Sequence, residues 1–209
     1  MNIRRQLAVA SVAAIAASGG DFMLLLVGNS MRNEPQLQSS AIVLTVGGLL
    51  GCVAIPLYAL GYSALARVIR STEPIAAQIV RVGGIAFAAL GAFIHGLTWS
   101  TIHNSAPAAS GPTTPLDAIA ASGGTLLGTW IAASVLLLIV AGAIAWSGLL
   151  RPRPISVWLA SFNPVVITLL IGAFGAATQF GRSYLVPAAP NLAHVVFFVA
   201  ALFAVAANE

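Results

Sequence analysis

Four titratable side chains stand out because they lie in or beside apolar stretches of the sequence. Asp21 falls within an apolar segment that begins near Leu7, and three histidines, His95, His103 and His194, lie near the ends of two later segments. Carboxylates and imidazoles are the groups that most often move protons in enzymes, and both also bind metal ions. If they meet in space, these residues predict acid–base chemistry or metal coordination.

The spacing of these residues places several of them on shared helix faces. His95, Trp99 and His103 follow one another at intervals of four residues, and Asn191 precedes His194 by three. Residues three or four apart lie on the same side of a helix. The pattern predicts that each group presents its polar side chains together.

Several chemistries are excluded by what the sequence lacks. It contains no lysine, so it has no Schiff-base lysine, no lysine nucleophile and no phosphate-binding loop of the usual type. The motifs CxxC, HExxH, GxSxG and GxGxxG are also missing, which removes support for thiol-redox, zinc-peptidase, hydrolase and dinucleotide-binding functions. Asp21 and the histidines remain the main candidates.

Composition determines the kind of element that must position these residues. Hydrophobic residues make up 59% of the 209 residues and charged residues only 7%, and the mean hydropathy is +0.97. A water-soluble domain of this size has too little interior to bury so much apolar surface. In lipid, a helix of roughly 20 apolar residues crosses about 30 Å of hydrocarbon and pairs its own backbone polar groups. We therefore expect an all-α integral membrane protein.

Apolar windows of sufficient length can be counted. Six are separated by polar, proline-bearing or arginine-bearing segments, at about 6–28, 41–66, 75–100, 119–149, 157–181 and 189–207. No ten-residue alternation of apolar and polar positions indicates a β-barrel. Only the loops at 29–40 and 101–118 are long. We expect one domain over residues 1–209, a bundle of six transmembrane helices without an interdomain linker.

Arginine supplies all nine basic residues, and its positions orient the bundle. One side of the expected bundle carries most of them: Arg4, Arg5, Arg67, Arg70, Arg151 and Arg153. Arg32 and Arg182 fall in the opposite loops. By the positive-inside rule the arginine-rich side is cytoplasmic, so both termini are inside, and we expect a multi-pass protein of a bacterial inner (plasma) membrane. The net charge of +4 then reflects topology, and we expect no nucleic-acid partner.

This topology brings the candidate residues to one side of the membrane. Asp21 lies about fifteen residues along the first span, which is roughly 20 Å from its inner end. A charged group in a spanning helix normally faces the bundle interior, so we expect Asp21, His95 and His194 to share a cavity in the outer half of the bilayer. Side chains expected to bind a substrate there are Phe22, Trp99, Gln179, Tyr184, Asn191, Phe197 and Phe198.

The heptapeptide AIAASGG occurs twice, at 14–20 and 118–124. Two inverted halves would be typical of a transporter. Shifting Tyr58 and His95 by the same offset, however, reaches Phe162 and Val199, which are of other types. We interpret the repeat as a product of Ala/Gly/Ser-rich composition, whose small residues let helices approach closely, as we also expect for Gly47 and Gly51.

The first functional hypothesis is a membrane-embedded enzyme. Burial in lipid would let Asp21 act as an acid or base near neutral pH, with His95 or His194 as its counterpart, in isomerisation, cyclisation or hydrolysis. Its partners would be membrane lipids and a hydrophobic small-molecule substrate. In a structural variant, Asp21 pairs with Arg182 or with a protonated histidine. Homo-oligomerisation is compatible with the sequence.

Other interpretations of the same residues remain open. A catalytic metal would be held by Asp21 together with His95, His103 or His194. A proton-coupled small-solute transporter would use the same groups, and a b-type haem protein would use His95 and His194 as axial ligands. The enzyme ranks first because polar groups on one side suit a pocket better than a path across the membrane.

Some residues also have simpler explanations. His103 could be solvated in a loop, Asn191 could cap a helix that starts after Pro190, and His194 could face lipid headgroups. Pro164 is expected to kink its helix, with Asn163 satisfying the freed backbone groups.

Overall fold

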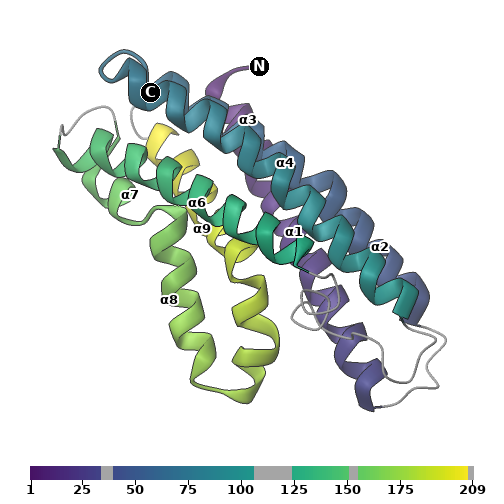
Figure 1. The fold of residues 1–209 in the computed structure, drawn as a ribbon. Helices are drawn as coiled ribbons and strands as arrows, with labels where there is room; N and C mark the ends of the chain where they lie inside the picture. Colours follow the sequence, from purple (N-terminus) through teal and green to yellow (C-terminus); the bar gives the residue numbers. More distant parts are fainter. Residues whose placement is uncertain (34–39, 106–123, 151–154, 207–209) are drawn as a thin grey trace.

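A computed structural model describes residues 1–33, 40–105, 124–150 and 155–206 of the chain. Within these ranges every regular element is a helix and no strand is present. The elements are α1 (Ile3–Asn33), α2 (Ser40–Ala54), η1 (Ile55–Leu57), α3 (Tyr58–Ile69), α4 (Pro74–Ser105), α6 (Thr125–Ala145), η2 (Trp146–Leu150), α7 (Val157–Ser161), α8 (Pro164–Ala176), η3 (Gly181–Leu185) and α9 (Val186–Ala206). The expected all-α architecture is confirmed (Figure 1).

Five helical stretches in the described ranges are long and apolar enough to cross a membrane: Ile3–Val27, Ile42–Ile69, Pro74–His103, Thr125–Gly148 and Gly181–Val205. They correspond to five of the six windows counted in the sequence. Many large apolar side chains on their outer faces are exposed, as expected for helices whose surroundings are lipid. The chain is therefore a multi-pass helical membrane protein.

The expected continuous span at 157–181 is wrong. The short helix α7 ends at Ser161, and α8 begins only at Pro164 and ends at Ala176. Asn163 caps α8: its side-chain oxygen accepts hydrogen bonds from the backbone N–H groups of Val165 and Val166, at 3.1 and 3.3 Å. Proline after this extended cap prevents the preceding helix from continuing. With 13 residues, α8 is about 20 Å long, which is shorter than the hydrocarbon core of a bilayer.

The last helix begins earlier than the sequence indicated. A π-helical turn at η3 leads directly into α9 at Val186, so Pro190 lies inside the helix. Asn191 therefore does not cap the start of this helix. Its side chain is available for a contact between helices. The last residue of the window at 189–207, Ala207, lies outside the described residues.

The helices pack around α1, which contacts α2, α3 and α9. The approach of α1 to α2 depends on glycine, because a Cβ atom at Gly20 would lie 2.7 Å from the carbonyl oxygen of Gly47. Gly124, which holds the place of Gly20 in the second AIAASGG copy, has a φ of 93° and precedes α6. The two glycines therefore have different structural roles. The rest of the second copy lies outside the described residues.

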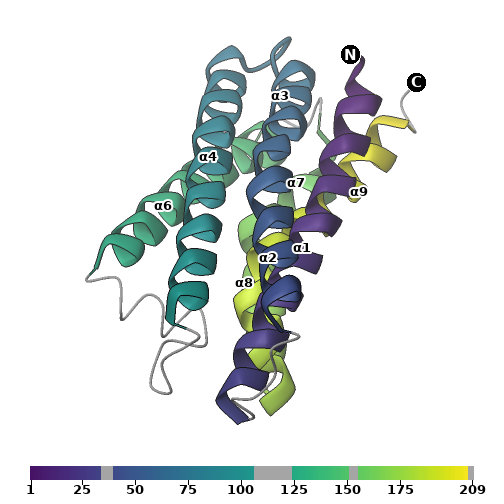
Figure 2. The ribbon, with the colours of Figure 1, turned by 90° about the vertical axis from the view of Figure 1, so that its right-hand side faces the viewer.

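Figure 2 shows the two ends of the bundle. The N-terminus, the end of α9 and the turn between α3 and α4 lie at one end, and α1 and α4 run from there to the other end. Two helix pairs, α4 with α6 and α8 with α9, pack closely within themselves. The candidate site lies where these two pairs face each other and α1.

Candidate functional site

Asp21 and His95 form a pair between α1 and α4. The Oδ1 atom of Asp21 lies 3.3 Å from the Nδ1 atom of His95. The side chain of His95 is 5% exposed and that of Asp21 is 15% exposed. The partner of Asp21 is therefore a histidine and not Arg182, whose exposed guanidinium donates to the carbonyl of Ala176 at 3.0 Å.

The second nitrogen of His95 determines where protons can reside in this pair. Its Nε2 lies 3.1 Å from the backbone carbonyl oxygen of Gly47, which only accepts hydrogen bonds, so Nε2 carries a proton. The Asp21–His95 contact then needs one further proton, either on Nδ1 facing a carboxylate or on the carboxyl group facing an imidazole. Both forms have zero net charge, which lowers the cost of burial. The pair can thus exchange one proton internally.

Asn191 and Tyr58 complete the environment of the carboxylate. The amide nitrogen of Asn191 donates to Oδ2 of Asp21 at 2.7 Å, and the hydroxyl of Tyr58 donates to the amide oxygen of Asn191 at 2.8 Å. The contacts thus form a chain in which Tyr58 of α3 bonds Asn191 of α9, and Asn191 bonds Asp21 of α1. Asp21 in turn contacts His95 of α4, and His95 contacts Gly47 of α2. Asp21 accepts a hydrogen bond from Asn191 on one side and shares a proton with His95 on the other, so it links the two halves of the chain.

Glycines in α2 make room for the aromatic side chains of α4. A Cβ atom at Gly51 would collide with the imidazole of His95, and one at Gly48 would collide with the indole of Trp99. The run Gly47-Gly48-Leu49-Leu50-Gly51 therefore forms a shallow groove in which His95 is seated. Close packing of this kind restricts the ring orientation that the pair with Asp21 requires.

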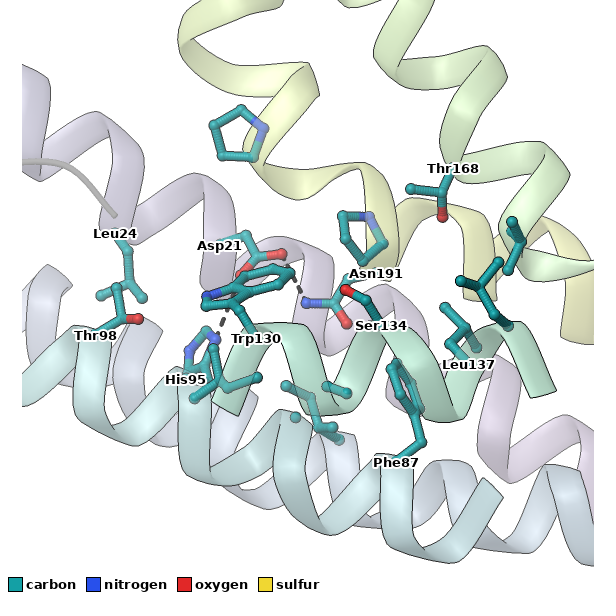
Figure 3. A pocket seen from close by; sticks show the side chains of 18 of the residues that line it. Asp21, Leu24, Phe87, His95, Thr98, Trp130, Ser134, Leu137, Thr168 and Asn191 are labelled. Atoms are coloured by element: carbon teal, nitrogen blue, oxygen red, sulfur yellow. Dashed lines mark hydrogen bonds and ion pairs between the residues drawn. The ribbon is translucent and has the colours of Figure 1, made fainter. Parts of the chain in front are cut away.

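A cavity of about 320 Å³ opens beside the pair. Asp21, His95 and Asn191 lie on its wall, and Figure 3 shows them with residues of α4, α6 and α8 around the same space. Most of the other lining side chains are apolar: Leu24, Leu25, Ile55, Phe87, Ile94, Leu137, Leu138, Val165 and Leu169. The volume is within the range of small-molecule sites, and the mixture of an apolar wall with few polar groups is typical of them.

His194 is near this site but is not part of its wall. Its Nδ1 lies 2.6 Å from the carbonyl oxygen of Pro190, so Nδ1 carries the proton, and Nε2 accepts from the hydroxyl of Tyr62 at 2.7 Å. The ring is fully buried and is stacked with Tyr58 and with Phe87 at centroid distances of 4.7 and 5.2 Å. Both nitrogens are engaged, so His194 is a packed residue behind the cavity.

The expected substrate-binding residues are dispersed. Phe197 and Phe198 are fully buried in the core, and Phe198 packs on Tyr58 and Tyr62. The remaining residues also lie off the cavity wall: Phe22 and Tyr184 are half-buried, Gln179 is exposed in the turn after α8, Trp99 packs on α2, and His103 is exposed beside Trp99. Of the expected set, only Asn191 lines the cavity.

The residues do not fit the expected metal or haem sites. Among the described residues, no three His, Cys, Asp or Glu side chains come together as a possible metal site. A haem needs a free nitrogen on each axial histidine. The ring nitrogens of both His95 and His194 already have hydrogen-bond partners, and His194 is covered by aromatic rings on both faces.

Several cavity residues were missed in the sequence. Trp130 and Ser134 line the cavity from α6, and Thr168 lines it from α8. Helix α6 is apolar on all sides, so no periodic pattern marks the face that these residues occupy. Tyr58 was not selected either, although its hydroxyl donates to Asn191.

Comparison with known families assigns the chain to one of them. A family of unknown function, DUF6796, matches residues 1–208. The chain belongs to this family. No curated protein and no solved structure gave a match. The family carries no activity that could be transferred, so any function has to be argued from the site.

Proposed function

We propose that this protein is a membrane-embedded enzyme that moves protons on a lipid-like or small apolar substrate, with Asp21 as the reacting acid or base. One observation carries this proposal: a carboxylate and an imidazole lie 3.3 Å apart on the wall of an apolar cavity of about 320 Å³. A charged pair inside a spanning bundle is costly and is normally associated with function.

Asp21 is the member of the pair that would contact the substrate. Both nitrogens of His95 are occupied, one by Asp21 and the other by the carbonyl of Gly47. The carboxylate oxygens of Asp21 have further lone pairs, and Asp21 lines the cavity. His95 is then a positioning residue, which orients the carboxylate through the proton that the two side chains share.

The geometry favours isomerisation or cyclisation over hydrolysis by a serine nucleophile. Activation of a serine needs an imidazole nitrogen that is free to take the hydroxyl proton. His95 has none. A carboxylate that alternately takes and returns a proton needs no such nucleophile. A single carboxylate–imidazole pair in a mostly apolar cavity also suits an enzyme pocket better than the polar path that a proton-coupled transporter needs.

A six-span topology with both termini in the cytoplasm is part of the proposal. The start of α1, the end of α9 and the turn between α3 and α4 lie at the same end of the bundle (Figure 2), and Arg4, Arg5, Arg67 and Arg70 fall near this end in the sequence. Helices α7 and α8 would together make the sixth crossing as a broken helix. In a bacterial inner membrane, the cavity would then receive its substrate from the lipid.

The test compares lipid extracts from cells that lack the native protein and express either wild type or a variant. Wild type should produce a lipid species whose mass equals that of a substrate and whose retention time differs, because isomerisation and cyclisation conserve mass. Asp21→Asn should not produce it. The control is Glu73→Gln, the same carboxylate-to-amide change just before α4. Equal product from Asp21→Asn and wild type would refute the proposal.

A further inference from the structure

The cavity holds polar groups that the Asp21–His95 pair does not use. The indole nitrogen of Trp130 is buried and has no hydrogen-bond partner in the described part of the chain. Ser134, one turn further along α6, is exposed in the structure, and no hydrogen bond joins its hydroxyl to a described residue. Both residues line the cavity, and residues four apart share a helix face.

Several hydroxyl side chains in these helices donate to their own backbone, whereas no hydrogen bond joins Ser134 or Thr98, which also lines the cavity, to a described residue. The three buried serines, Ser11, Ser18 and Ser147, each donate to the carbonyl four residues earlier. Thr168, on the opposite wall of the cavity, also donates to the carbonyl four residues earlier, at 2.7 Å. Ser134 does not use this ordinary partner, so its hydroxyl is available to a ligand.

An unpaired buried donor is unfavourable, and a ligand oxygen that accepts from it would remove that penalty. Indole N–H is a donor only, which identifies the complementary ligand atom as an acceptor. Figure 3 shows Trp130 and Ser134 projecting from α6 toward the side of the cavity that carries Asp21 and Asn191. The arrangement therefore combines two donors with one carboxylate, and apolar side chains surround them.

We infer that the substrate is a lipophilic ketone or aldehyde whose oxygen is bound by Trp130 and Ser134. This inference rests on the proposed function and specifies its substrate class. Donors held against a carbonyl oxygen stabilise the negative charge that develops there when a neighbouring carbon loses a proton. A carboxylate beside such donors is a suitable base for that proton.

The proton and electron changes of this step balance. The carboxylate of Asp21 takes a proton from the carbon next to the carbonyl, and the electrons of the broken C–H bond pass to the oxygen, which becomes an enolate. Hydrogen bonds from Trp130 and Ser134 hold that oxygen. In an unsaturated substrate, Asp21 then returns the proton to the far end of the conjugated system, so the double bond moves and the mass is unchanged.

The experiment measures exchange at the carbon beside a carbonyl, which requires no knowledge of the natural substrate. Decan-2-one is incubated in D₂O with the purified full-length protein in detergent, and deuterium uptake is followed by mass spectrometry. Wild type should accelerate uptake over detergent alone, and Asp21→Asn should abolish the acceleration. Trp130→Phe and Ser134→Ala should each lower it by on the order of tenfold or more.

Matched controls separate this effect from general damage to the bundle. Trp158→Phe and Ser161→Ala make the same changes in α7, at an exposed tryptophan and a half-buried serine off the cavity wall, and should exchange at the wild-type rate. Binding of decane, followed by saturation-transfer NMR, should be retained in Trp130→Phe and Ser134→Ala because decane has no oxygen to bind. Loss of decane binding in both variants would contradict a specific role for their polar atoms.

The outcomes distinguish this inference from the proposed function. If Trp130→Phe and Ser134→Ala both exchange at the wild-type rate while Asp21→Asn does not, the assignment of the oxygen site is overturned and the role of Asp21 stands. A second outcome is that wild type exchanges no deuterium into the ketone while cells still make the Asp21-dependent lipid product. In that case the assignment of a ketone or aldehyde substrate is overturned and the proposed function stands. If both the exchange and the lipid product are absent, the proposed function fails as well.

Discussion

His95 is held between two acceptors, since its Nδ1 lies 3.3 Å from the carboxylate of Asp21 and its Nε2 lies 3.1 Å from the carbonyl of Gly47. The proton on Nε2 is required by the carbonyl, so only the proton between Nδ1 and the carboxylate can move. This relationship gives the site one mobile proton in an otherwise apolar cavity. It also determines how the site should respond to substitution.

Asp21→Asn should leave the stability of the protein close to that of wild type. The amide oxygen of the new residue can accept from Asn191, and its amide nitrogen can donate to Nδ1 of a neutral His95. Asp21→Ala removes both interactions and should lower the free energy of unfolding by about 3–5 kcal/mol. Thermal unfolding in detergent measures the stability of both variants. A large loss in Asp21→Asn would show that the pair requires a charged carboxylate for folding.

Nε2 should carry a proton in His95 and none in His194. His194 carries its proton on Nδ1, because that atom faces the carbonyl of Pro190, whereas His95 always carries a proton on Nε2. NMR of protein labelled with ¹⁵N-histidine can resolve them, because the sequence contains only three histidines. His95→Gln and His194→Gln variants assign the signals. An unprotonated Nε2 on His95 would contradict the hydrogen-bond arrangement.

Gly51→Ala should destabilise the protein by about 1–3 kcal/mol, because the new methyl group would collide with the ring of His95. It should also displace His95 from Asp21 and so lower activity. Gly19→Ala is a matched control, since no atom lies within 4 Å of a Cβ placed there. That variant should be neutral or more stable by up to about 1 kcal/mol, because alanine favours helix. Equal effects of the two substitutions on chemical unfolding would count against the packing of His95 on α2.

Tyr62→Phe should cost about 1–3 kcal/mol, because it leaves the buried Nε2 of His194 without a donor. Tyr184→Phe, at a half-buried tyrosine off the cavity wall, should change stability little. Neither substitution touches the cavity, so substrate turnover should be retained in both variants once they are folded. Loss of turnover in folded Tyr62→Phe would assign His194 to the chemistry, as the sequence first suggested.

The helices could largely be predicted from the sequence, because the length of apolar runs is set by the thickness of the bilayer. The break at Asn163 and Pro164 was recognised only as a kink. Whether the helix breaks completely at this point depends on how Asn163 caps α8, and the hydropathy of the sequence gives no information about capping. Pro190 was interpreted as a helix start, although the preceding π-helical turn lets α9 begin at Val186.

The candidate site could be predicted in part. A carboxylate in an apolar helix needs polar partners, so Asp21, His95 and Asn191 could be selected by residue type alone. The sequence did not show that His194 lies off the cavity wall, because its contact with Tyr62 depends on how α3 and α9 are rotated about their axes. Trp130 and Ser134 could not be selected, because α6 is apolar on all sides and its orientation is determined by packing on α4.

If Asp21 transfers protons to and from a membrane-soluble substrate, deuterium from the solvent should reach that substrate. Purified wild type and Asp21→Asn, each shown to be folded by thermal unfolding, are incubated with a total lipid extract in D₂O. Wild type should place deuterium on carbon in at least one lipid species, and Asp21→Asn should not. Identical deuterium patterns from the two proteins would contradict this role of Asp21.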